Sequence, residues 1–86
     1  MEINGIFFKN IIDLRDEKDF LKKNIRGSIN ISYEKLLIYP DQYLDKDSEY
    51  LLICDYGIKS KKVSEILNRM GYHTHSLRKG YKHIEN

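Results

Sequence analysis

The sequence predicts an α/β fold with a mostly parallel central sheet. Short β-prone runs alternate along the chain with segments of helical spacing, which is typical of parallel strands joined by helical crossovers. The run at 49–53 is apolar and β-prone, as in a strand buried on both faces. After it, apolar residues recur at helical spacing with polar residues opposite them. These apolar positions are Val63, Ile66, Leu67 and Met70.

The N-terminal segments predict a first strand and helix. Residues 4–8 indicate a turn followed by either a short edge strand or an apolar lead-in. Residues 10–14 are β-branched and predict an inner strand. Asp16 then suits the N-cap of a short helix with acidic residues in its first turn. We expect Phe20 and Leu21 to be the buried side of this helix.

A second strand and helix follow. Apolar and polar residues alternate over 25–31, which predicts a short strand with Ile29 and Ile31 on one face. Ser32 is a suitable cap for a helix over residues 33–38. The sequence therefore predicts a further strand-helix unit before the central strand.

The remaining segments connect and close the sheet. The break at 39–41 ends the preceding helix, and 41–48 is expected to be a polar surface connection. Gly71 suits the position after the end of the long helix. Residues 73–77 predict a moderate strand, and 80–86 predict a short helix or a frayed tail.

Length and composition limit the protein class. The 86 residues, 41% hydrophobic and 33% charged, predict one globular domain over 1–86 rather than a disordered or collagen-like chain. No apolar stretch approaches the roughly 20 residues of a membrane span, and the N-terminus lacks a basic signal region. We therefore expect a cytoplasmic protein with no membrane partner.

The charge is small overall but unevenly distributed. The net charge of +2 is too small to indicate a nucleic-acid partner. Residues 1–57 hold 8 Lys and Arg against 11 Asp and Glu, whereas 58–86 hold 7 against 2. The basic half favours a small anionic substrate, although a solvated helix face explains it equally well. We expect a monomer.

Cys54 is the only cysteine, and it follows the central strand. It has no disulfide partner and no resolving thiol within the chain, so any covalent adduct on it must be discharged by another molecule. Gly57 permits backbone N–H groups to converge on the sulfur, and the following helix start and Lys59 favour a thiolate, while Asp55 opposes it. The alternative is an inert cysteine buried in the core.

The segment Cys54-x-x-Gly57-x-Lys59-Ser60 resembles the active-site segment of rhodanese (sulfurtransferase) domains. The upstream segments 13–20 (Asp-x-Arg-x-x-x-Asp-Phe) and 25–31 (Ile-x-Gly-Ser-x-Asn-Ile) resemble the family's other signature in order and spacing. The resemblance implies a single rhodanese-like domain with a mostly parallel central sheet flanked by helices on both faces, in agreement with the α/β pattern of elements.

The resemblance also implies a reaction. Cys54 would take sulfane sulfur from thiosulfate or another small anionic donor, become a persulfide, and pass the sulfur to cyanide or a thiol, including a protein thiol. No cofactor is implied. His73 and His75 lack further ligands, so we expect no metal site. The implied substrate-binding residues are those of the loop after the cysteine: Asp55, Tyr56, Gly57, Ile58, Lys59 and Ser60.

Two other functions remain open. Related phosphatases and arsenate reductases have one more residue in this loop, so the six residues from Cys54 to Lys59 favour sulfur over phosphate or arsenate chemistry. A non-catalytic binding module is the other alternative.

The chain departs from the family pattern at 23–24, where Gly-His is common, and at Lys59, where Arg is usual. It also departs at Lys79, where a Gly-Gly pair is frequent.

Asp13 and Arg15 lie in the upstream signature. Both could contact the active site. We expect them instead to hold that segment together through an ion pair or hydrogen bonds.

Overall fold

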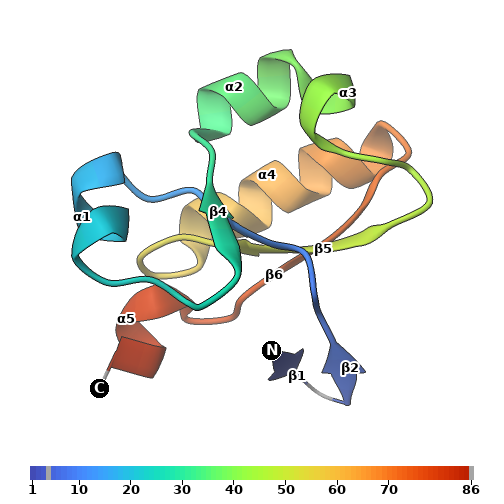
Figure 1. Cartoon of the computed structure of the whole chain (residues 1–86). Helices are drawn as coiled ribbons and strands as arrows, with labels where there is room; N and C mark the ends of the chain where they lie inside the picture. Colours follow the sequence, from blue (N-terminus) through green and yellow to red (C-terminus); the bar gives the residue numbers. More distant parts are fainter. Residues whose placement is uncertain (4, 86) are drawn as a thin grey trace.

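A four-stranded parallel sheet forms the centre of the computed structural model, which describes residues 1–3 and 5–85. Its strand order is β4-β3-β5-β6 (Figure 1). All three neighbouring pairs are parallel, which confirms the predicted α/β class. The strands are β3 (Ile11–Asp13), β4 (Ser28–Asn30), β5 (Glu49–Ile53) and β6 (His73–Ser76).

Helices and a small hairpin surround this sheet. The N-terminal β1 (Glu2–Ile3) and β2 (Ile6–Phe7) pair as an antiparallel hairpin, so the edge-strand alternative for this segment is the correct one. Asn4, in the predicted turn, and Asn86 lie outside the described residues. The helices are α1 (Glu17–Lys22), α2 (Tyr33–Ile38), α3 (Pro40–Tyr43), α4 (Ile58–Arg69) and α5 (Gly80–Glu85). None of the helices within the described ranges is both long and apolar enough to cross a membrane.

The sheet buries apolar side chains on both faces. One core joins Ile12 and Leu52, which are paired across β3 and β5, to residues of α2 and α4. The other joins Ile11 and Leu51 to the N-terminal segment and to Tyr81 of α5. After Glu49 every residue of β5 is buried, as the continuous apolar run predicts. Helices therefore cover both faces, and β5 lies at the centre.

The buried face of α4 differs from the predicted one. Val63 and Leu67 are buried, but Ile66 and Met70 keep 41% and 44% of their surface exposed. Ser60 and Ser64 are buried in their place. Both serines have hydrogen-bond partners, Ser60 with Cys54 and Ser76 and Ser64 with Thr74, and buried polar groups need such partners. The spacing of apolar residues alone therefore assigned Ile66 and Met70 to the buried face, although both are exposed.

Two predictions in the first half of the chain are wrong. In α1, Leu21 is 71% exposed and Phe20 only half-buried, because this six-residue helix buries none of its side chains. Asp16 occupies the N-cap, but its side chain makes no capping bond. Ile29 and Ile31 do not share a face. β4 ends at Asn30, so alternation stops there, and Ile29 is exposed while Ile31 is buried.

The capping predictions hold better. Ser32 Oγ accepts a hydrogen bond from the Lys35 N–H at the start of α2, and Gly71, with φ +100°, follows the C-cap of α4. Pro40 does more than end α2, because it occupies the first turn of α3, where its missing N–H costs little. The predicted connection at 41–48 therefore begins inside a helix.

Candidate active site

The site lies where the order of the strands reverses. From β3 the chain moves to β4 on one side and then returns to β5 on the other, so the carboxyl ends of β3 and β5 adjoin. Open α/β sheets bind ligands in the crevice outside such a point. Leu14 and Arg15 follow β3 there, and Cys54 follows β5. The topology alone therefore brings the two sequence signatures together.

Cys54 Sγ is surrounded by polar groups although the residue is only 6% exposed. The Gly57 N–H donates to Sγ at 3.1 Å and the Ser60 N–H at 3.3 Å. Ser60 Oγ lies 3.3 Å from Sγ and shares a hydrogen bond of 2.6 Å with Ser76 Oγ. Two backbone donors that converge on one sulfur stabilise negative charge there. These surroundings differ from the apolar packing of an inert core cysteine.

The N-terminus of α5 holds the loop in this conformation. The Tyr81 N–H donates to the Cys54 carbonyl at 2.8 Å and the Lys82 N–H to the Asp55 carbonyl at 2.9 Å. Gly57 has φ +86°, and a Cβ there would lie 2.9 Å from Lys79 N. A Cβ on Gly80 would lie even closer to the Asp55 carbonyl oxygen. Only glycines permit this approach, which turns carbonyls toward α5 and N–H groups toward the sulfur.

A pocket of about 600 Å³ opens above Cys54. Arg15, Lys59 and Lys62 are its cations, and Asp16 and Asp55 its carboxylates. The rest of its wall is mainly apolar and aromatic. These residues are Leu14, Tyr33, Leu37, Tyr56, Ile58, Val63 and Ile66.

Lys59 is held at the wall of the pocket by an aromatic ring. Its ammonium lies 4.3 Å from the centroid of the Tyr33 ring, within the range of a cation–π interaction. Tyr33 and Lys59 also line a second, more polar pocket of about 380 Å³ that adjoins the first. A positive charge therefore stands between the two hollows.

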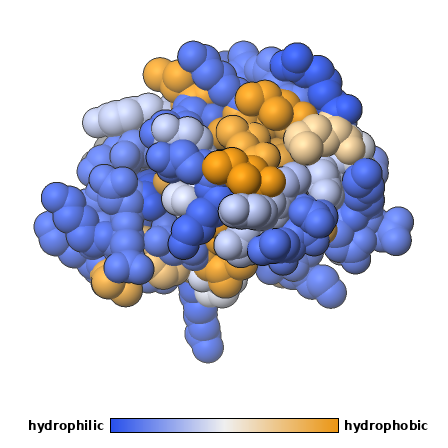
Figure 2. All heavy atoms as spheres, turned by 90° about the horizontal axis from the view of Figure 1, so that it is seen from above, coloured by the Kyte–Doolittle hydropathy of each residue, from blue (hydrophilic) through white to orange (hydrophobic). Residues whose placement is uncertain are grey.

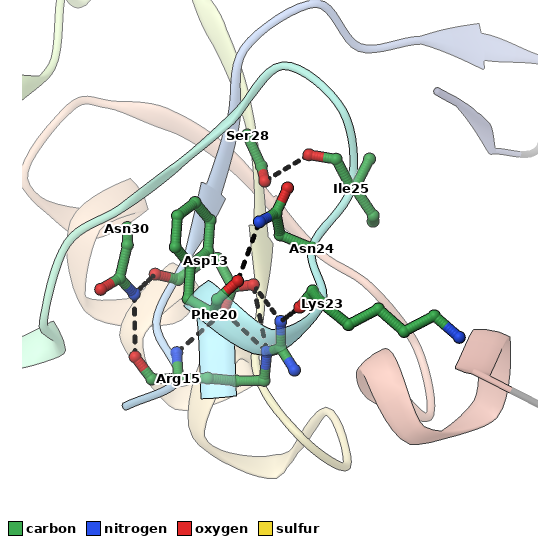
Figure 3. Close-up of polar contacts among 8 residues, drawn as sticks. All are labelled: Asp13, Arg15, Phe20, Lys23, Asn24, Ile25, Ser28 and Asn30. Atoms are coloured by element: carbon green, nitrogen blue, oxygen red, sulfur yellow. Dashed lines mark hydrogen bonds and ion pairs between the residues drawn. The ribbon is translucent and has the colours of Figure 1, made fainter. Parts of the chain in front are cut away.

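Asp13 and Arg15 form the expected ion pair, and Figure 3 shows that they point toward each other. Arg15 Nη2 lies 2.8 Å from Asp13 Oδ2 and donates to the Lys23 carbonyl at 2.6 Å. Burial lowers the pKa of Arg15, but the hydrogen bond and charge of Asp13, with smaller effects of Tyr81 and Asp55, raise it above its usual value. The Arg15 guanidinium also stacks on the Tyr81 ring at 3.7 Å. The ion pair holds the segment after β3 together, and Arg15 also lines the pocket.

The predicted site residues lie together in two roles. Asp55, Tyr56, Ile58 and Lys59 line the pocket, whereas Gly57 and Ser60 contact the sulfur through their N–H groups. The charge of Asp55 contributes to the raised pKa of Arg15, so this carboxylate acts on the guanidinium.

Sequence reasoning missed several residues of the site. Ser76, on β6, and Tyr33, on α2, come from distant segments, and no local pattern marks them. Lys62 and Ile66 carry a usable signal, because they continue the face of α4 that begins at Ile58.

The two histidines of β6 lie away from this site. His75 Nε2 lies 2.5 Å from Glu49 Oε2, at the opposite end of β5, and its ring packs against Phe8 at 5.0 Å. Across residues 1–3 and 5–85, no three His, Cys, Asp or Glu side chains group to hold a metal ion.

Comparisons with known proteins agree with this geometry. The model of the rhodanese-like domain family matches residues 2–86. The chain is 33% identical over 69 residues to a tRNA sulfurtransferase of Pyrobaculum aerophilum, covering 80% of the chain and 14% of that protein. It is 31% identical over 62 residues to the thiosulfate sulfurtransferase GlpE of Shewanella oneidensis, covering 72% and 60%. The chain thus spans less than two thirds of either relative.

The fold is also similar to solved structures. A rhodanese-related protein from Thermoplasma volcanium superposes with a TM-score of 0.77 at 27% identity, covering 88% of this chain and 76% of that one. A protein from Staphylococcus saprophyticus gives the same TM-score at 25% identity, covering 86% and 73%.

Proposed function

Because the chain belongs to the rhodanese-like domain family, we propose that it is a sulfurtransferase that carries sulfane sulfur as a persulfide on Cys54. Two relatives with about a third of their aligned residues identical are named sulfurtransferases. The observation that carries the proposal is the convergence of the Gly57 and Ser60 N–H groups on Cys54 Sγ at the base of a pocket.

In the first half-reaction the Cys54 thiolate attacks the outer sulfur of a small anionic donor. With thiosulfate, the new bond joins Sγ to that sulfur, the S–S bond of the donor breaks, and its electron pair leaves with sulfite. The product is the persulfide anion Cys54–S–S⁻. No proton is transferred, so the thiolate needs no general base.

In the second half-reaction an acceptor attacks the outer sulfur of the persulfide. Cyanide takes this sulfur as thiocyanate, and the electron pair of the broken bond returns to Cys54 as a thiolate. A thiol, including a protein thiol, acts in the same way and becomes a persulfide. The two half-reactions form a ping-pong cycle.

The residues of the pocket have distinct roles in this scheme. The N–H groups of the loop donate to the charge that moves from Sγ to the outer sulfur. Lys59 and Lys62 attract the anionic donor, and Lys59 takes the place of the usual arginine as a point charge without a planar fork.

The test is the intact mass of the protein after incubation with thiosulfate and removal of excess reagent. We expect a gain of one sulfur atom that disappears on addition of cyanide, with release of thiocyanate. Cys54→Ser is the matched control, since it keeps the shape of the side chain and should gain nothing. No gain with thiosulfate or with an organic persulfide would reject the proposal and favour a non-catalytic binding module.

A further inference from the structure

We propose that the Cys54 pocket selects an organic sulfur donor, one whose sulfane sulfur is attached to an anionic group on an apolar body. This inference rests on the proposed function and specifies its substrate class. Inorganic thiosulfate would react at the same sulfur, but it would leave most of the pocket unused.

The size of the pocket is the first observation. Its volume of about 600 Å³ falls within the range of sites that enclose whole organic ligands. Thiosulfate has five atoms and offers no apolar surface. A donor that fills the pocket must carry a larger group beyond the reacting sulfur.

The composition of the wall is the second observation. Tyr56, Ile58 and Ile66 line the pocket and stay largely exposed, although large apolar side chains are normally buried. Seen from the side of α2 and α3, hydrophobic side chains gather near the middle of the face and hydrophilic ones surround them (Figure 2). The exposed apolar wall stands beside the nucleophile.

The third observation is that Ile66, which the helical spacing places in the core, lines the pocket instead. The spacing of α4 predicts that Ile66 faces inward, yet the structure turns it toward the pocket because Ser60 and Ser64 take the buried face. Departures from local pattern of this kind concentrate at functional sites. Contact with an apolar donor would remove this exposed surface from water.

The charges of the pocket complement an anionic donor. Lys59 and Lys62 stand on α4 next to the apolar wall, and across residues 1–3 and 5–85 neither forms an ion pair. The carboxylates of the pocket, Asp16 and Asp55, are accompanied by Arg15, whose pKa the charge of Asp55 helps to raise. Thus an apolar body can lie on Ile58 and Ile66 while its anionic group meets the lysines.

The reaction of such a donor balances without another reagent. For an organic thiosulfonate, R–SO₂–S⁻, the Cys54 thiolate forms a bond to the terminal sulfur, and the S–S bond of the donor breaks. The electron pair leaves with the sulfinate R–SO₂⁻, and Cys54 becomes the persulfide anion. Two negative charges enter and two leave, and the sulfinate is the group that the lysines would bind.

The experiment compares benzenethiosulfonate with methanethiosulfonate, which share the reacting group and differ in the apolar body. Turnover is followed by thiocyanate release with cyanide as acceptor. Each kcat/KM is divided by the rate constant of the same donor with a free thiolate in solution, which removes the difference in intrinsic reactivity. We expect the phenyl donor to be favoured by about tenfold or more, as for added apolar groups in a matching pocket.

Two positions on the same face of α4 give matched variants. Ile66 lines the pocket, whereas Met70, one turn further and equally exposed, is not among the residues that line it. Ile66→Ser should reduce the preference severalfold and leave the methyl donor within about twofold, while Met70→Ser should change neither. Ile58→Ser is a second variant at an exposed position of the wall, for use if Ile66→Ser lowers the stability of the fold.

The outcomes separate the two proposals. If neither donor nor thiosulfate loads sulfur onto Cys54, the proposed function fails. If thiosulfate loads it and neither organic donor does, the function stands and the inference is overturned. If both donors load it with equal normalised rates, the function stands and the inference is overturned. A phenyl preference that survives in both Ile66→Ser and Ile58→Ser would also overturn it, because the apolar body would then bind elsewhere.

Discussion

Two buried polar clusters meet at the carboxyl end of the sheet, and they use their hydrogen bonds differently. In the Asp13 cluster (Asp13, Arg15 and Asn30), side chains bond to each other and to the backbone carbonyls of two segments, residues 13–15 and Lys23. In the Cys54 cluster (Cys54, Gly57, Ser60 and Ser76), donors converge on one sulfur below a pocket. In the Asp13 cluster the hydrogen bonds stabilise the fold around the cluster. In the Cys54 cluster the backbone donors point at a reactive sulfur.

The difference shows how a structural cluster can be told from a site. Asn30 donates to the Asp13 and Arg15 carbonyls, both at 2.9 Å, and Arg15 donates to Asp13 and to Lys23 (Figure 3). The opposite charges of Asp13 and Arg15 are thus paired, and the Asn30 amide donates to carbonyls of the same cluster. Around Cys54 the donors are backbone groups, and the sulfur is the group that a reaction would change. Burial alone does not distinguish the clusters, because Asp13 and Arg15 are buried in one and Cys54 and Ser60 are buried in the other.

Removal of the Asp13 carboxylate should have the largest effect on stability. Asp13→Ala leaves the Arg15 guanidinium buried without its partner, which typically costs about 3–5 kcal/mol. Urea unfolding measures the loss, and Glu17→Ala, an exposed carboxylate in the first turn of α1, should cost less than about 1 kcal/mol. A loss below 1 kcal/mol for Asp13→Ala would contradict the structural role of this cluster.

The stabilising charge of Arg15 should be present over the whole neutral range. Its pKa is raised in the folded protein, so its contribution is complete below the ordinary arginine pKa and is lost only as the pH rises through the raised one. Both values lie far above neutral. The cost of Asp13→Ala should therefore be similar at about pH 6 and pH 9 as far as Arg15 is concerned, which urea unfolding at the two pH values checks.

The next prediction tests how the Cys54 loop packs against the turn before α5. Gly57→Ala forces a left-handed conformation on alanine, at about 1–2 kcal/mol, and places its Cβ 2.9 Å from Lys79 N. We expect a loss of stability together with loss of sulfur loading. Gly27→Ala is the matched control, because Gly27 has φ +87° and open space around its Cβ position. Equal stability and equal loading in the two variants would show that the close approach is unimportant.

A further prediction separates the role of the Ser60 side chain from that of its N–H group. Ser60→Ala keeps the backbone donor to Cys54 Sγ and removes the hydroxyl that bonds Ser76 Oγ, so sulfur loading should slow by less than about tenfold, far below the loss of a whole site donor. Ser64→Ala, one turn along α4, removes a buried hydroxyl bonded to Thr74. It should lower stability by about 1–3 kcal/mol without slower loading. If Ser60→Ala abolishes loading, the hydroxyl is the main donor.

Local sequence signals predicted those parts of the fold that local physics determines. The strand at 49–53, the Ser32 cap and the stop at Gly71 depend on neighbouring residues, and all three lie where expected. The buried face of α4 depends on partners from β6, which spacing along one helix does not contain. The prediction that Leu21 is buried was wrong for a similar reason, since hydropathy does not tell whether a short helix packs against another surface.

The candidate site divides in the same way. The residues that contact Sγ come from one continuous segment, so the pattern around Cys54 named them. The opposite wall comes from the end of β3 and from α2, and it depends on the strand order that brings β3 beside β5. Tyr33 therefore carried no signal. Arg15 was visible only through the resemblance of its segment to a family signature.

The smallest expected effect concerns Lys79, in the turn that packs against Gly57. It is the one non-glycine residue in the described chain with positive φ, at +66°, and its side chain is exposed. Lys79→Gly should relieve about 1–2 kcal/mol of left-handed strain and lose about 0.5–1 kcal/mol through the greater freedom of the unfolded chain. We expect a net gain of about 0.5–1 kcal/mol in urea unfolding, with unchanged sulfur loading. Lys79→Ala keeps the strain and should gain nothing. A loss of loading in Lys79→Gly alone would mean that the strained turn belongs to the Cys54 cluster, and the boundary between the two clusters would have to be moved to include it.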